Sequence, residues 1–210
     1  MRPNVLVVMA DQLRATASAL HHPSGVATPA YARLAASGVR FDAACTPHPL
    51  CVPARVSLWT GRWPHAHGAR RNETLMPPHE THAFHVWREH GFELGLIGKN
   101  HCFTAADQPL FDVWCELGHE GRTSAPARGM AWVRPEAAID AAHAPRRSMP
   151  RQGRAVSWRV SDTDPDDASS GVVAAQAAAF VRARATAERP FALWVSFPDP
   201  HTPYEVPCAL

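Results

Sequence analysis

Continuous apolar runs recur along the chain and are separated by longer stretches of mixed polarity. Residues 5–9 and 191–197 are apolar and rich in β-branched or aromatic side chains. Runs of this kind are typical of strands that are buried on both faces of a parallel sheet. Residues 92–97 predict another such strand, and residues 39–41 predict a short one after a glycine.

Helical patterns lie between the predicted strands. Residues 28–38 begin with Thr28 and Pro29 and end at Gly38, which suits an N-cap, a first-turn proline and a C-terminal glycine. Further helices are expected at about residues 53–60, 79–90 and 168–187. Because strands and helices alternate, we expect an α/β fold with a mainly parallel sheet flanked by helices.

One segment departs from this alternation. Residues 119–167 are rich in proline, arginine and alanine, and their hydrophobic periodicity is weak. We expect an irregular insertion or lid in this segment. A chain of 210 residues is long enough to bury a core, so we expect residues 1–210 to belong to one domain that carries the insertion.

The charge pattern and the lengths of the apolar stretches argue against two classes of partner. The chain has 21 Lys and Arg residues against 19 Asp and Glu residues, and no basic block marks a nucleic-acid interface. Lys99 is the only lysine in the sequence. No apolar stretch approaches the length of a membrane span. We therefore expect neither nucleic acid nor a membrane as a partner.

The cysteines and the first residues bear on the compartment. Five cysteines at irregular spacing do not suggest a disulfide framework, and no Cys-x-x-Cys pair predicts a structural zinc site. The apolar run that begins at Val5 is too short for the core of a signal peptide and ends at Asp11. A reducing, cytoplasmic location is the expectation.

Polar side chains follow several of the predicted strands. Asp11 follows the first strand, Lys99 and His101 follow a middle one, and His201 follows the last. Ligands of open α/β sheets bind at the carboxyl ends of the strands. We therefore expect these four side chains to approach one another at one edge of the sheet.

The stretch from Cys51 to Arg55 opens a predicted helix. Pro53 suits the first turn, where its missing N–H is not needed. Arg55 lies one turn after Cys51, and the helix N-terminus adds free N–H groups and the positive end of its dipole. A nucleophile, a cation and a dipole thus converge, which suits attack on a sulfate or phosphate ester.

This stretch, followed in register by Thr60 and Gly61, resembles the sulfatase signature of the alkaline-phosphatase-like superfamily. The resemblance implies that Cys51 is oxidised to formylglycine by a formylglycine-generating enzyme, and that Arg55 supports it. A hydroxyl of the hydrated aldehyde would attack sulfur or phosphorus. The resemblance also implies one divalent metal ion, Ca²⁺, Mg²⁺ or Mn²⁺, bound by Asp11 and residue 51.

Two further motifs are similar to those of the same family. The run from Gly98 to His101 resembles its Gly-Lys-x-His motif, which implies that Lys99 bridges the nucleophile and the transferred group. His101 would then assist the nucleophile's hydroxyl or the breakdown of the covalent intermediate. The Pro-His-x-Pro loop around His201 implies that this imidazole protonates the leaving oxygen.

Gln12 stands where the family usually has a second aspartate. This departure looks like the branch that holds choline sulfatases and phosphonate monoester hydrolases. In that branch Gln12 would contact the metal weakly or bind substrate, and Asn72 would bind substrate.

The expected activity is metal-dependent hydrolysis of small sulfate esters through a formylglycine derived from Cys51. Hydrolysis of phosphonate monoesters or phosphodiesters stays open as an alternative, although Lys99 favours sulfate. Members of the family are considerably longer, and their second half completes the metal site. The chain is therefore expected to be the N-terminal half of the fold, and an inactive fragment is the third alternative.

Overall fold

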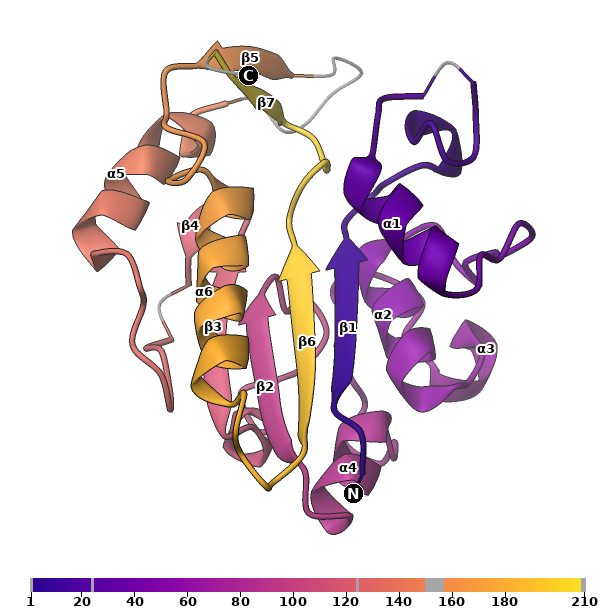
Figure 1. Ribbon diagram of the computed structural model, residues 1–210. Helices are drawn as coiled ribbons and strands as arrows, with labels where there is room; N and C mark the ends of the chain where they lie inside the picture. The colour runs from indigo at the N-terminus through magenta and orange to yellow at the C-terminus, as the bar shows by residue number, and fades with distance from the viewer. Residues whose placement is uncertain (1, 24, 124, 150–156, 209–210) are drawn as a thin grey trace.

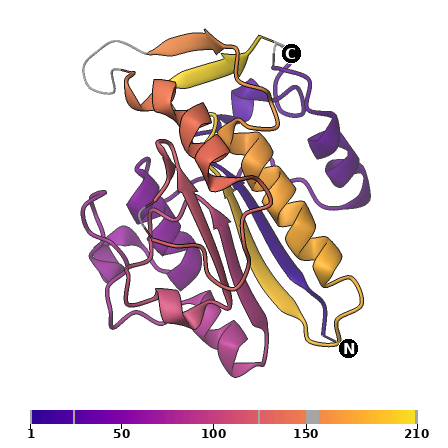
Figure 2. The ribbon, with the colours of Figure 1, turned by 90° about the vertical axis from the view of Figure 1, so that its left-hand side faces the viewer.

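Five strands form a central sheet that lies between two layers of helices (Figures 1 and 2). The computed structural model describes residues 2–23, 25–123, 125–149 and 157–208. Across the sheet the strand order is β1-β6-β2-β3-β4. The strands are β1 (Val5–Ala10), β6 (Phe191–Phe197), β2 (Glu93–Gly98), β3 (Val113–Gly118) and β4 (Gly121–Arg122).

The first four strands of this order are parallel, and β4 is antiparallel to β3. Ala10 at the end of β1 is in register with Phe197 at the end of β6, and Gly98 at the end of β2 is in register with Ser196. The carboxyl ends of these strands therefore finish level at one edge of the sheet. This edge is where the sequence places its candidate functional residues.

Helices cover the two faces of the sheet with different parts of the core. On one face α2 (Cys51–Thr60) and α4 (Ala83–Glu89) contribute to an aromatic core that includes Trp59, Phe84 and Trp194. On the other face α6 (Ser169–Ala183) and α5 (Glu136–Arg147) pack over aliphatic side chains of β2, β3 and β6.

The remaining elements lie outside this sandwich. β5 (Trp158–Ser161) and β7 (Tyr204–Pro207) pair in parallel as a separate two-stranded sheet, seen at the top of Figure 1. The short helices are α1 (Pro29–Ser37), α3 (Pro64–His67), η1 (Ala15–Ala17) and η2 (Gln108–Leu110).

The α/β prediction is confirmed, and so are most of its elements. β6 is buried on both faces along nearly all of its length, as its apolar run predicted. α1, α4 and α6 form within the expected ranges, although α4 and α6 are shorter than predicted, and β2 is shifted by one residue from its predicted bounds. α2 begins at Cys51, which puts Pro53 in its first turn.

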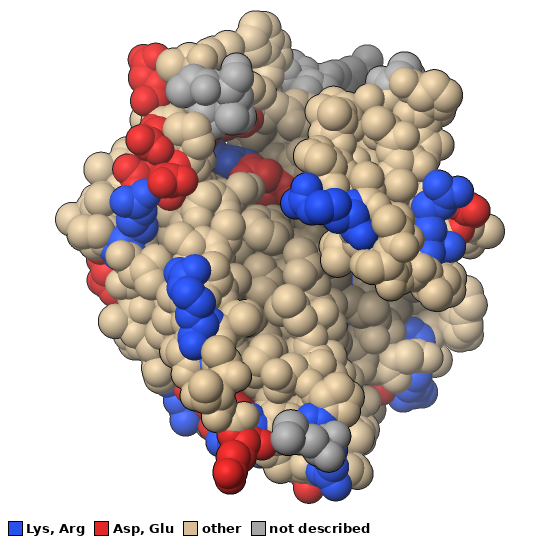
Figure 3. Space-filling model, in the orientation of Figure 1, with Lys and Arg blue, Asp and Glu red and all other residues tan. Residues whose placement is uncertain are grey.

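β1 is a strand, but the expectation that both its faces are buried is wrong. Leu6 is 51% exposed and Val8 57%. They lie in register with Leu193 and Val195, on the side of the sheet where α6 covers β2, β3 and β6. Figure 3 views this side, and its centre carries few charged side chains. An apolar run does not reveal whether its strand lies in the interior of a sheet or, as β1 does among the described strands, at its edge.

Two other expectations differ from the structure. Residues 39–41 form no strand, and Val39 and Phe41 are exposed, because no neighbouring strand pairs with so short a run. The segment 119–167 is not irregular throughout, since it contains β4, α5 and β5. Part of it, residues 150–156, lies outside the described residues. Its action as a lid stays a prediction.

Within the described ranges, the helices are all too short or too polar to cross a lipid bilayer.

The aromatic core supplies a stability prediction. Phe84 is fully buried and contacts the rings of Trp59, Trp87, Phe103 and Phe111. Phe84→Ala leaves a cavity among these rings, so the free energy of unfolding is expected to fall by about 3–5 kcal/mol. Urea denaturation followed by tryptophan fluorescence measures this change.

Val86 on the same helix provides the matched control, because its side chain is 44% exposed. Val86→Ala is expected to change the free energy of unfolding by less than about 1 kcal/mol. Equal losses from the two substitutions would mean that α4 does not pack through Phe84.

Candidate active site

The site is built around Asp11, the first residue after β1. Its backbone N–H donates to the carbonyl of Phe197 at 3.1 Å, which extends the pairing of β1 with β6. Its carboxylate is buried at the carboxyl edge of the sheet. The chain then turns sharply, because Gln12 has a φ of +58°, a left-handed conformation that few residues other than glycine adopt.

Cys51 is the first residue of α2. Leu50 precedes the helix in an extended conformation, and its side chain makes no capping hydrogen bond. Asn72, from a loop beyond α3, supplies the cap instead: its Oδ1 accepts a hydrogen bond from the N–H of Val52 at 3.2 Å. The position of Cys51 thus depends on a side chain that is twenty residues away in the sequence.

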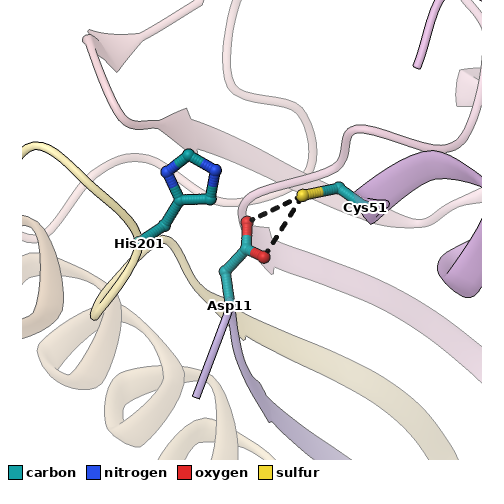
Figure 4. Close-up of side chains that lie close together, drawn as sticks. All are labelled: Asp11, Cys51 and His201. Atoms are coloured by element: carbon teal, nitrogen blue, oxygen red, sulfur yellow. Dashed lines mark hydrogen bonds between the residues drawn. The ribbon is translucent and has the colours of Figure 1, made fainter. Parts of the chain in front are cut away.

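Cys51 and Asp11 meet His201 in the close-up of Figure 4. The thiol of Cys51 donates toward the Asp11 carboxylate, with Sγ 3.4 Å from Oδ1 and 3.6 Å from Oδ2. One ligand atom from each of the three side chains lies within 4.8 Å of the other two. The carboxyl ends of β1 and β6 and the N-terminus of α2 therefore converge on one point.

Lys99 reaches the same point from the end of β2. Gly98 has a φ of +97°, and a Cβ there would lie 2.1 Å from the carbonyl oxygen of Ser196, so only glycine lets the chain turn at this place. The ammonium of Lys99 then donates to Oδ2 of Asp11 and lies 3.8 Å from Sγ of Cys51.

Arg55 brings a second cation from α2. Its Nη1 donates to the carbonyl of Lys99 at 2.9 Å, to that of Asn100 at 3.2 Å and to Oγ of Ser196 at 2.9 Å. Its Nη2 lies 3.6 Å from Oδ2 of Asp11 and has no hydrogen-bond partner among the described residues. One side of the guanidinium is therefore anchored, and the other faces the site.

The ionisation of Asp11 follows from these neighbours. Burial alone raises the pKa of Asp11, but the contact with His119 and the charges of Lys99 and Arg55 outweigh it and hold the pKa well below its usual range. Burial lowers the pKa of Lys99 and of Arg55, and the charge of Asp11 opposes this in both. The site is thus a buried carboxylate between two cations.

The thiol of Cys51 is protonated in this environment. Burial raises its pKa, the charge of Lys99 opposes the rise, and the charge of Asp11 adds to it, so that the pKa lies above its usual value. A thiol is a far weaker nucleophile than a thiolate. Unmodified Cys51 is therefore poorly suited to attack an ester.

Three histidines lie around Asp11 and Cys51. His201 is half-buried, and its Nδ1 donates to the carbonyl of Thr202 at 2.5 Å, which leaves Nε2 to carry a further proton. His101 has a φ of +44°, and its buried Nδ1 has no partner in the described part of the chain. Burial is the main cause that lowers the pKa of His101 to about 4, and it also lowers the pKa of His201.

His119 is a site residue that the sequence did not predict. It follows β3, and its Nε2 accepts a hydrogen bond from Lys99 at 2.6 Å and lies 3.6 Å from Oδ2 of Asp11. Its ring lies 4.2 Å from that of His201, and burial lowers its pKa to about 4. A polar residue directly after a strand is the signal that could have found it. The run from Val113 to Gly118, however, contains Glu116 near its end and lacks the continuous apolar pattern of a buried strand.

A cleft of about 830 Å³ opens over the cluster. Its polar wall includes Asp11, Cys51, Arg55, His201, and the two predicted substrate-binding residues Gln12 and Asn72. Leu50, Leu58 and Trp63 contribute exposed apolar surface to the rim. The cleft thus combines a charged floor with an apolar rim.

Asp11 and Cys51 could together begin the shell of a metal ion, and His201 lies beside them. Hard divalent cations take six or more oxygen ligands, and Asp11 is the only carboxylate of this group. Its Oδ2 is already in contact with Lys99, Arg55 and His119. The described residues therefore fit part of the shell of such an ion and do not complete it.

Comparisons with known proteins agree with this geometry. Residues 3–209 match the model of the sulfatase family. Human arylsulfatase D is 31% identical over 162 residues, which are 62% of this chain and 27% of that protein. An uncharacterised Escherichia coli sulfatase, YidJ, is 25% identical over 212 residues, 98% of this chain and 40% of the relative. The chain thus spans less than half the length of these relatives.

A solved structure has the same fold over nearly the whole chain. The phosphonate monoester hydrolase of Agrobacterium radiobacter aligns with a TM-score of 0.64 and 25% sequence identity. The alignment covers 98% of this chain and 42% of the hydrolase. The family resemblance that Cys51 and Arg55 indicated is confirmed by these matches.

Proposed function

Because this chain belongs to the sulfatase family, we propose that its site hydrolyses sulfate esters with residue 51 as the nucleophile. The observation that carries the proposal is the convergence of Cys51, Asp11 and His201 within 4.8 Å at the floor of the cleft. Lys99 and Arg55 place two positive charges beside them. A bound sulfate ester would thus meet a nucleophile, two cations and a proton carrier.

Cys51 acts after its conversion to formylglycine by a formylglycine-generating enzyme. The hydrated aldehyde supplies a hydroxyl nucleophile, which a protonated thiol does not. Asp11, which accepts the thiol hydrogen bond at 3.4 Å, is placed to accept a hydrogen bond from that hydroxyl. The helix N-terminus of α2 adds a favourable dipole at the same position.

Arg55 and Lys99 stabilise the negative charge on the oxygens of the transferred sulfate group. The unpartnered Nη2 of Arg55 and the ammonium of Lys99 both lie at the nucleophile's side of the cleft. Cations fixed in a buried site stabilise developing charge strongly because they need no reorganisation during the reaction. Both cations are held in place: three hydrogen bonds fix Nη1 of Arg55, and the ammonium of Lys99 is bonded to Asp11 and His119.

His201 donates a proton to the departing ester oxygen. Its Nδ1 hydrogen bond to Thr202 fixes the ring, and Nε2 carries the proton that is transferred. His101 assists the hydroxyl of residue 51 or the breakdown of the sulfated residue. Gln12 and Asn72 border the cleft and contact the bound ester.

A divalent cation, Ca²⁺, Mg²⁺ or Mn²⁺, would be held first by Asp11 and residue 51 and would add positive charge beside the transferred group. Sulfatases generally depend on a metal ion and a formylglycine. The roles given above to Arg55, Lys99 and His201 do not depend on the identity of that ion.

Hydrolysis of phosphonate monoesters is the second candidate. Two observations favour it: Gln12 stands in place of a second aspartate, and the phosphonate monoester hydrolase of Agrobacterium radiobacter has this fold at 25% identity. Sulfate and phosphonate esters are both tetrahedral oxyanions, so the same cations bind either group. Lys99, paired with Asp11 beside Cys51, is the feature that favours sulfate.

Relative turnover decides between the two. The complete natural polypeptide that contains these residues is produced together with a formylglycine-generating enzyme and assayed with 4-nitrophenyl sulfate and 4-nitrophenyl phenylphosphonate. We expect the higher kcat/KM for the sulfate. A higher value for the phosphonate would contradict sulfate as the preferred substrate. The 210-residue chain assayed alone tests the third alternative, that it is inactive by itself.

A further inference from the structure

The loop that carries His201 is held from outside the cleft by one arginine. Arg146 lies in the last turn of α5, and its side chain is almost completely buried. Its Nη1 donates to Oδ1 of Asp199 at 2.8 Å, and its Nη2 donates to the carbonyl of His201 at 3.3 Å and to that of Pro203 at 3.2 Å. These three acceptors bracket His201 on both sides.

A second contact ties the same loop to α6. Ser170, in the first turn of α6, donates to Oδ2 of Asp199 at 2.7 Å. The Asp199 carboxylate is therefore held on one oxygen by Arg146 and on the other by Ser170. The loop between β6 and β7 is fixed against two helices that also cover the sheet.

The helix that carries Arg146, α5, is itself held in place. His143, one turn before Arg146, donates through Nδ1 to the carbonyl of Ile139 at 2.6 Å, and its Nε2 accepts from Ser169 at 2.8 Å. Burial lowers the pKa of His143, so the imidazole is neutral. α5 is thus bonded to the start of α6, and Arg146 extends from a rigid support.

Stability alone does not account for a guanidinium at this place. Burying an ion pair gains little net stability, and apolar side chains of similar volume often serve as well. The planar fork of arginine is needed where several acceptors must be held in a fixed geometry. Here Nη1 also donates to Oγ of Ser169 at 3.5 Å, and two of the four acceptors are main-chain carbonyls, one of which belongs to His201 itself.

The orientation of the imidazole depends on the backbone that Arg146 holds. The ring of His201 is bonded through Nδ1 to the carbonyl of the next residue, Thr202. A change in the backbone at residues 201–203 therefore turns the ring and moves Nε2 away from Cys51 and Asp11. The ring of His119, 4.2 Å away, limits the space for other orientations.

We propose that Arg146 is a positioning residue for His201, which holds the loop so that the imidazole delivers its proton to the departing ester oxygen. This inference rests on the proposed function. In the step concerned, the hydroxyl oxygen of the hydrated residue 51 bonds to sulfur and gives its proton to Asp11, which accepts the hydrogen bond of that residue. The sulfur–oxygen bond to the leaving group breaks as the proton moves from Nε2 of His201 to the departing oxygen. Arg146 touches neither atom and acts through the loop.

Leaving groups of different basicity test this role. A phenolate or alkoxide whose conjugate acid has a high pKa needs protonation as it departs, whereas 4-nitrophenolate departs without it. Arg146→Met is therefore expected to lower kcat about tenfold or more for phenyl and alkyl sulfates, a part of the 10²–10⁴-fold that general acids supply. The loss for 4-nitrophenyl sulfate is expected to be much smaller. Arg146→Lys keeps the charge without the fork and is expected to restore only part of the rate.

Arg147 provides the matched control. It is the next residue of α5 and is exposed, and its guanidinium donates to the carbonyls of Glu120 and Asp140 rather than to the His201 loop. Arg147→Met is expected to behave like the unsubstituted protein with every leaving group. An equal loss of rate for all leaving groups in Arg146→Met would assign that residue a merely structural role and overturn the proposal.

A second readout is independent of activity. The ring-proton NMR signals of His201 are assigned by their loss in His201→Ala. They are recorded for the 210-residue chain, for Arg146→Lys and for Arg147→Met. We expect the signals to shift or broaden in Arg146→Lys and to stay unchanged in Arg147→Met. Unchanged His201 signals in Arg146→Lys would overturn the proposal. Absence of turnover in the unsubstituted protein would count against the proposed function alone, and the NMR comparison would still decide on Arg146.

Discussion

Cys51→Ala is expected to lower the turnover of sulfate esters by roughly 10⁴-fold or more, as removal of a covalent nucleophile does in other hydrolases. Alanine retains the helix start, since Asn72 caps the N–H of Val52 and not that of residue 51. It removes the thiol whose oxidation yields the aldehyde, and with it the hydroxyl nucleophile. Arg55, Lys99 and His201 stay in place, so substrate binding is expected to change less than kcat. Steady-state kinetics with 4-nitrophenyl sulfate measure both.

Two other cysteines serve as controls. Cys45 lines the same cleft and is exposed, so Cys45→Ala is expected to keep normal turnover and stability. Cys102 is fully buried in the aromatic core, so Cys102→Ala is expected to lower the stability but not the turnover of the folded protein. Comparable losses of turnover in Cys45→Ala and Cys51→Ala would show that residue 51 has no special role.

Arg55→Lys is expected to lower kcat on the order of 100-fold, the effect of losing one donor that stabilises a developing oxyanion. The guanidinium makes three anchoring hydrogen bonds through Nη1 and presents Nη2 to the site, 3.6 Å from Asp11. An ammonium has one nitrogen and cannot do both. Kinetics and urea denaturation of the same variant separate the loss of rate from the loss of stability.

Arg62 is the control for this substitution. It lines the same cleft, but its side chain is half-exposed and forms an ion pair with Glu80 at 2.5 Å. Arg62→Lys retains the charge and this pair, so near-normal turnover is expected. If Arg55→Lys also keeps near-normal turnover, the assigned charge stabilisation is wrong.

The sequence predicted the parts of the fold that depend on local pattern. β6 is a long and mainly apolar run, and its strand bounds and its burial along nearly all of its length follow from that run alone. The placement of Asp11, Lys99 and His201 at one edge followed from the rule for strand ends, and the structure brings the three together. The helix after Cys51 followed from Pro53 and the helical spacing of Arg55, although it begins two residues before the predicted start, at Cys51 itself.

The rest depends on pairing between distant segments. The exposure of Leu6 and Val8 depends on which strands α6 covers, which no local pattern reveals. His119 was missed because β3, with a charged residue near its end, does not read as a buried strand. Arg146 was missed because its partners lie more than fifty residues away, in the His201 loop. The cytoplasmic location stays a prediction from the sequence.

The mass of the peptide that contains residue 51 tests the central claim most directly. Trypsin is expected to release residues 41–55, which contain both Cys45 and Cys51. In protein produced with a formylglycine-generating enzyme, fragment ions should show the aldehyde in place of the thiol at residue 51, with Cys45 unchanged as the internal standard. Fully active protein in which residue 51 keeps its thiol would contradict the account.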